Sequence, residues 1–109
     1  MTPDDPIKQN KKIVVYIDAE LEELIPGFFE NRRNDIKAIQ EALAKGDYET
    51  IKILGHRMKG SGGGYGFDEI SQIGGFLEQA AKKQNSQEIQ KGLNKLLTYL
   101  ENVEIVYKN

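Results

Sequence analysis

The chain contains one histidine, His56, within the stretch GHRMKGSGGGYGFDE that spans residues 55–69. Lys59 follows three residues later, and a cluster of glycines begins directly after it. A neutral imidazole is a nucleophile and a proton acceptor near neutral pH, and a lysine one helical turn away can stabilise developing negative charge. Three interpretations are open: a loop that cradles phosphate, a structural turn, or a histidine left exposed for a partner to reach.

The two common phosphate-binding motifs do not fit these residues. A P-loop requires G-x-x-x-x-G-K-[ST] after a strand. Gly55 and Gly60 have that spacing, but Ser61 stands where the lysine should be, and the preceding segment is helical in pattern. The dinucleotide fingerprint G-x-G-x-x-G also fails from each possible starting glycine. We therefore do not predict a nucleotide site.

A helical wheel predicts where His56 points. With residues 47–65 as one helix and His56 at zero, the apolar stripe falls within about 40° of the opposite side, which would face the core. His56 is therefore expected to face solvent, although the wheel does not separate a functional histidine from an ordinary surface one. The stripe consists of Ile51, Leu54, Met58, Ser61 and Tyr65.

The glycines beside His56 favour a functional interpretation. Gly60 and Gly63 lie within about 40° of His56 on the wheel, and Lys59 lies about 60° to one side. Each mid-helix glycine costs about 1 kcal/mol relative to alanine, and the missing side chains let another protein approach closely. The alternative, that the helix simply ends in a turn here, stays open for Gly64 and Gly66.

Composition limits the classes of function. The 109 residues fit one domain, and 15 basic against 17 acidic residues argue against nucleic acid as the main partner. The absence of cysteine excludes disulfides and thiolate chemistry, and a single histidine excludes multi-histidine metal sites. We expect no metal and no cofactor. Neither a membrane span nor a signal peptide is indicated, so we expect a cytoplasmic protein and a monomer.

The hydrophobic pattern predicts an all-α fold, an antiparallel up-down four-helix bundle preceded by a short helix and an extended arm. Residues 1–17 would form the tail and the arm, in which Ile13–Ile17 has β-type composition but no second strand to pair with; residues 18–109 would form the bundle. Asp18 is expected to cap a short helix ending at Leu24, before Pro26. Four longer helices would follow, with apolar faces within residues 28–43, 47–65, 70–81 and 89–107, and with caps at Asp47, Asp68 and Asn85.

His56-x-x-Lys59-Gly60-Ser61, followed by glycines as far as Gly66, resembles the signature of histidine-containing phosphotransfer (HPt) domains. The resemblance extends from Asp18 to the C-terminus. It departs from the family pattern in small ways, with Met58 where leucine is common and Gly62 where serine or alanine is common.

The resemblance implies a phosphorelay intermediate that is not a conventional enzyme. His56 would accept a phosphoryl group from a receiver-domain aspartyl phosphate and pass it to another receiver aspartate, with Lys59 steadying the phosphoryl oxygens. Its partners would be response-regulator receivers and a hybrid histidine kinase, with the metal ion belonging to the receiver. Gly60 and Gly63 would let the receiver seat over the imidazole. Arg57 and Lys52 would be further docking residues, although plain solvation is the simpler explanation for both cations.

Two rival functions remain. One is an interaction module that binds a receiver without turning phosphate over. The other is a small hydrolase with His56 as general base, which would need a positioned carboxylate. Asp68 and Glu69 are the nearest downstream acids, and capping a helix is the simpler use for them.

Overall fold

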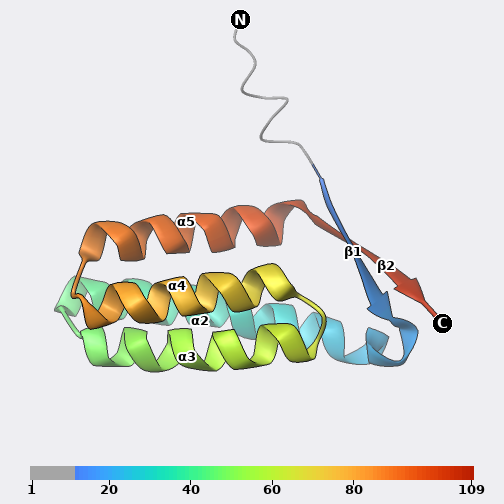
Figure 1. Cartoon of the computed structure of the whole chain (residues 1–109), viewed down its shortest axis with the longest axis horizontal. Coiled ribbons are helices and arrows are strands. Elements are labelled where there is room, and N and C mark those ends of the chain that lie inside the picture. The colour runs from blue at the N-terminus through green and yellow to red at the C-terminus, as the bar shows by residue number, and fades with distance from the viewer. Residues whose placement is uncertain (1–11) are drawn as a thin grey trace, which may run out of the picture.

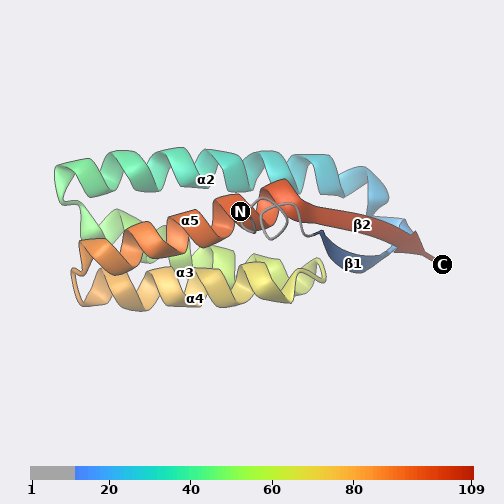
Figure 2. The same ribbon diagram turned by 90° about the horizontal axis from the view of Figure 1, so that it is seen from above.

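The computed structural model describes residues 12–109 and consists of four helices with a small pair of strands at one end (Figure 1). In chain order the elements are β1 (Ile13–Asp18), the 3-10 helix η1 (Ala19–Leu24), α2 (Ile25–Lys45), α3 (Tyr48–Gly64), α4 (Asp68–Lys82), α5 (Ser86–Asn102) and β2 (Val103–Lys108). Successive helices run in alternating directions and lie side by side in both views (Figures 1 and 2). Residues 1–11 of the predicted tail lie outside the described residues.

Local sequence explains most of the helix boundaries. The Asp47 side chain accepts a hydrogen bond from the Thr50 amide, and that of Asn85 accepts one from the Glu88 amide, so both act as the N-caps that the sequence predicted. Gly46 ends α2 with a φ of 71°, a left-handed conformation that glycine adopts without steric cost. These short turns bring neighbouring helices close together.

One predicted boundary differs in detail. Phe67, not Asp68, is the N-cap of α4, and no side chain caps that helix; Asp68 instead lies in its first turn, where a negative charge favours the helix dipole. Asp18 accepts a hydrogen bond from the Glu20 amide and so caps η1, as expected. Pro26 lies at the start of α2, where its missing N–H leaves no helical bond unmade.

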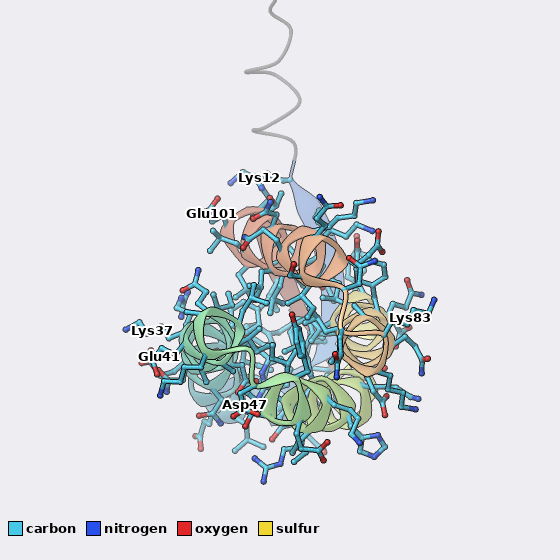
Figure 3. All side chains as sticks on the ribbon, turned by 90° about the vertical axis from the view of Figure 1, so that its left-hand side faces the viewer. Lys12, Lys37, Glu41, Asp47, Lys83 and Glu101 are labelled. Atoms are coloured by element: carbon cyan, nitrogen blue, oxygen red, sulfur yellow. The ribbon has the colours of Figure 1, made fainter. Side chains whose placement is uncertain are left out.

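The helices enclose one hydrophobic core, seen end-on in Figure 3 with Lys37, Glu41, Lys83 and Glu101 pointing outward. Its fully buried side chains include Ile39 from α2, Ile51 and Met58 from α3, Leu77 from α4 and Leu96 from α5. Among residues 12–109, none of the helices combines the length and hydropathy needed to cross a membrane.

The extended arm is a strand, which corrects the prediction of an unpaired segment. β1 pairs in parallel with β2, with Ile13 opposite Val103 and Asp18 opposite Lys108. Val103 and Tyr107 were expected in the last helix because they continue its apolar spacing, and that expectation is wrong. In the structure α5 ends at Asn102, and Val103 is already extended with a ψ of 136°. The run VEIVY alternates in burial as a half-buried strand does.

Helices α3 and α4 pack against each other through glycines. A Cβ added to Gly74 would lie 2.5 Å from the Lys59 amide nitrogen, and one added to Gly55 would lie 2.8 Å from the Glu78 amide nitrogen. Gly62 is equally tight, with a Cβ position 2.6 Å from the Ser71 amide nitrogen. The two backbones therefore approach as closely as they do only because these side chains are absent.

Candidate functional site

His56 lies midway along α3 with its side chain 70% exposed. Ile51 and Met58, on the opposite side of the helix, are both fully buried. The wheel placed the histidine correctly because the buried stripe of α3 fixes the rotation of the helix. The imidazole is therefore open to a partner molecule.

A carboxylate from the neighbouring helix holds the imidazole. His56 Nδ1 lies 3.1 Å from Oε2 of Glu78, which is on α4 and is only 8% exposed. The close glycine contact between α3 and α4 explains this arrangement, since the Glu78 backbone lies directly against Gly55, one residue before His56. Glu78 was not predicted from the sequence, where Asp68 and Glu69 were the only candidate partner carboxylates.

Lys59 reaches the same carboxylate from the next turn of α3. Its Nζ lies 3.7 Å from Oε1 of Glu78, and its side chain is 53% exposed. That buried oxygen has no hydrogen-bond partner among the described residues, and the Lys59 ammonium forms an ion pair with it. His56, Glu78 and Lys59 thus form one charged cluster on the surface of α3 and α4.

The ionisation state of Glu78 follows from its surroundings. Burial raises the pKa of Glu78, but the hydrogen bond from His56 and nearby positive charges outweigh it, and the pKa lies below its ordinary value of 4.5. The positive side chains nearby are Lys59 and Lys82. An ionised carboxylate only accepts hydrogen bonds, so Nδ1 of His56 must donate. The other ring nitrogen, Nε2, is then the one with a free lone pair.

The surface beside His56 lacks side chains where the wheel predicted. A Cβ at Gly60, Gly63 or Gly64 would meet nothing within 4 Å. Gly62, in the middle of the same run, is instead buried against α4. The glycine run therefore has two environments, with Gly60, Gly63 and Gly64 open to solvent and Gly62 packed against α4.

Comparison with protein families agrees with this geometry. The family model described as "Hpt domain" matches residues 23–104. The chain belongs to the Hpt domain family. No curated protein and no solved structure matches the chain. Hpt domains carry phosphoryl groups in phosphorelays and interact with the receivers of two-component systems.

The remaining predicted docking residues of this Hpt domain lie on the same helix. Lys52 is half-exposed, with its Nζ 3.3 Å from Oε1 of Glu49 on the preceding turn. Arg57, next to His56, is exposed. Asp68 and Glu69 begin α4, so they precede Glu78 by about 15 Å along the helix axis. Glu78, and neither of those acids, is the carboxylate that contacts His56.

Arg32, in the first half of α2, makes contacts that stabilise the fold. Its Nε donates to Asp35 over 2.9 Å and its Nη1 donates to Ser61 over 3.1 Å, linking α2 to α3. Its guanidinium also stacks 4.7 Å from the Phe28 ring centroid. These contacts leave only 11% of its side chain exposed, which is little for docking.

Among residues 12–109, no cluster of metal ligands accompanies the Hpt histidine. Within the part of the chain that the structure describes, no three acidic, histidine or cysteine side chains gather as metal ligands. Glu78 is the only carboxylate paired with His56 there, and both of its oxygens face positive groups of the chain. The cluster is thus built to hold an imidazole and a lysine.

Proposed function

We propose that this Hpt domain is a phosphorelay intermediate in which His56 accepts a phosphoryl group from a receiver aspartyl phosphate and passes it to another receiver aspartate. The observation that carries the proposal is the exposed imidazole held at Nδ1 by buried Glu78. A hydrogen bond on that nitrogen orients the ring and selects the tautomer whose Nε2 lone pair points outward.

The transfer follows from that tautomer. Nε2 of His56 attacks the phosphorus, the N–P bond forms, and the bond from phosphorus to the aspartyl oxygen breaks to release the receiver's carboxylate. The ring then carries a positive charge and still has its proton on Nδ1. The Glu78 carboxylate, hydrogen-bonded to that proton, stabilises this charge. The reverse sequence delivers the group to the next receiver.

Lys59 supplies the second charge. Phosphoryl transfer passes through a loose transition state, in which positioning and charge stabilisation provide most of the catalysis. The lysine lies one turn from His56, and its ammonium is held loosely at 3.7 Å from Glu78. Its exposed side chain can turn from Glu78 to the phosphoryl oxygens when a receiver docks.

The receiver would approach over the open part of α3. Gly60 and Gly63 present bare backbone beside His56, and no atom of the chain lies within 4 Å of where their side chains would be. Arg57 and Lys52 would border that area with positive charge. The receiver would bring its own acidic pocket and metal ion, so the Hpt domain needs no cofactor and acts as a phosphocarrier and not as a kinase. A hybrid histidine kinase would supply the phosphate.

The alternative is a module that binds a receiver without transferring phosphate. Both functions need an open docking surface, but only transfer needs a nucleophilic nitrogen with its partner nitrogen engaged. The His56–Glu78 contact therefore favours transfer.

A phosphate-localisation experiment tests the proposal. The chain is mixed with a panel of phosphorylated receivers, and acid-labile phosphate is located by intact and peptide-level mass spectrometry. We expect the label on His56 and none on a His56→Gln variant that melts at the same temperature as the parent chain. Lys52→Ala serves as a matched control and keeps the label. Receiver binding without phosphate on His56 would instead identify the binding module.

A further inference from the structure

The strand pair is an incomplete sheet. β1 and β2 have only each other as hydrogen-bonded neighbours among residues 12–109. In a two-stranded sheet, each strand has a free edge, along which unpaired N–H and C=O groups can pair with another chain. Both edges lie at one end of the helices (Figure 1).

One face of the sheet is covered and the other is not. On the covered face, Ile17 is 1% exposed and packs into the core. On the open face, Val14 is 48% exposed, Tyr16 is 62% exposed and Val106 is 38% exposed. Three large apolar side chains therefore stand together in solvent, since Tyr16 and Val106 are directly opposite in the register.

The two free edges differ in their protection. Natural edge strands carry charges, prolines or bulges that prevent pairing with other chains. β2 has Glu104 within it and Lys108 at its end. β1 also ends on a charge, Asp18, but within it residues 13–17 contain no charge, proline or glycine. β1 is thus the edge whose interior, unlike that of β2 with Glu104, presents no such obstacle to pairing.

The edge of β1 is complementary to itself. If two copies of β1 run antiparallel about a two-fold axis through Val15, Lys12 of one copy lies opposite Asp18 of the other, and this happens twice. Val14 of one copy then lies opposite Tyr16 of the other on the open face, where aromatic and β-branched pairs stabilise a sheet. Charge and shape both fit in the same register.

We propose that this protein self-associates through β1, with two copies forming a four-stranded sheet in the order β2–β1–β1–β2. This inference goes beyond the phosphotransfer function and does not depend on it. The expectation from the sequence was a monomer in which Ile13–Ile17 is an arm lying on the bundle. The proposal makes this segment the interface between two copies.

Pairing through β1 leaves the phosphotransfer surface open. His56 precedes Gly64, the end of α3 nearest the strands, by eight residues, or about 12 Å along the helix axis (Figure 1). Both histidines of the pair therefore remain accessible to receivers. An interface of one short strand from each copy is small, so the association is expected to be weak and concentration-dependent.

The first experiment measures mass against concentration by light scattering, from about 10 µM to about 1 mM. We expect the mass to rise from that of one chain, 12.3 kDa, towards twice that value. Lys12→Glu places like charges opposite each other twice and should weaken association about tenfold or more. Glu104→Lys, a charge change on β2, is the matched control and should associate like the parent chain.

Complementary charges sharpen the test. An equal mixture of Lys12→Glu and Asp18→Lys chains makes two attractive pairs, whereas each variant alone makes two repulsive ones, so mixing should restore association. Asp18 also caps η1, so the melting temperature of Asp18→Lys is recorded beside it.

Cysteine cross-linking fixes the register without that complication, because the chain has no cysteine of its own. A mixture of Val14→Cys and Tyr16→Cys chains should form a disulfide between variants in higher yield than either alone. A mass of one chain throughout the concentration range would overturn the proposal. Loss of association in Glu104→Lys alone would overturn it too, by moving the interface to β2.

Discussion

Helix α3 has glycines on two faces, and the two sets differ in their surroundings: one is packed against α4 and the other faces solvent. Gly55 and Gly62 lie against α4, where even one added carbon would fall 2.6–2.8 Å from backbone atoms. Gly60 and Gly63 have no neighbour within 4 Å. The same residue type thus permits close approach by a helix of the same chain on one face and leaves bare backbone open to solvent on the other.

The packed and open glycines of α3 together explain how the site is assembled. The packed glycines bring α4 close enough for Glu78 to reach His56, and the open ones leave the far side of the imidazole free. Changing a packed glycine should therefore damage stability, while changing an open one should damage only transfer.

The largest effect should be a difference in unfolding free energy between alanine variants of two adjacent glycines, Gly62 and Gly63. Gly62→Ala places a Cβ against the Ser71 and Phe67 backbones and should cost about 2–3 kcal/mol of unfolding free energy, because neither backbone can move cheaply. Gly63→Ala, its matched control, meets nothing and should gain up to about 1 kcal/mol. Chemical denaturation of both variants measures the difference. Equal stabilities would remove the distinction between the two faces.

The next largest effect should be on transfer alone. Gly60→Val leaves the fold as stable as before, since its side chain enters open space, but it obstructs a receiver approaching His56. Misplacing reacting groups by about 1 Å can cost about a hundredfold in rate, so we expect a loss of at least tenfold. Single-turnover transfer from a phosphorylated receiver measures it. A normal rate in Gly60→Val would show that the open glycines have no docking role.

Glu78→Gln tests whether the carboxylate that the packed glycines bring to His56 contributes to transfer. Glutamine keeps the shape but not the charge that stabilises the phosphorylated ring, so transfer should fall roughly tenfold to a hundredfold. An unchanged rate would mean that the Glu78 carboxylate contributes only to folding.

The stability of the parent chain should also depend on this carboxylate. Because the pKa of Glu78 is lower in the folded chain than its ordinary value of 4.5, its ionised form stabilises the fold above about pH 4.5. That contribution disappears as the pH falls through the folded-state value. The difference in unfolding free energy between the parent chain and Glu78→Gln should therefore shrink on acidification. A difference that grew instead would reverse the sign of the shift.

The smallest effect is expected at the border of the open face. Lys52 already pairs with Glu49 on its own helix, and such exposed pairs contribute little. Lys52→Ala should slow transfer about twofold at low salt, and added salt should erase the difference. A loss as large as that of Gly60→Val would make charge, and not close approach, the main docking interaction.

Sequence alone predicted the parts that depend on local pattern. The rotation of α3 and the exposure of His56 followed from Ile51 and Met58, because an amphipathic helix has one possible buried face. The caps at Asp47 and Asn85 followed from side chains that bond to nearby amides.

The parts that depend on distant contacts were missed. Glu78 follows His56 by 22 residues, and nothing local marks it except that it lies one turn after Gly74 on the face that packs against α3. β2 was assigned to the last helix because Val103 and Tyr107 also fit helical spacing, and only pairing with β1 decides between the two structures. Gly62 was not distinguished from the other glycines of the run. A helix advances by about 100° per residue, so Gly62 faces α4 while the adjacent Gly63 faces solvent.

The most direct test of the central claim is nitrogen and phosphorus NMR on the ¹⁵N-labelled, phosphorylated chain, which identifies the ring nitrogen that carries the phosphate. The geometry predicts an N–P bond at Nε2 of His56, with the proton on Nδ1 donated to Glu78. Phosphate on Nδ1 would require the His56–Glu78 hydrogen bond to break. That result, or phosphate on any other residue, would contradict the assignment of His56 and Glu78 as the transfer pair.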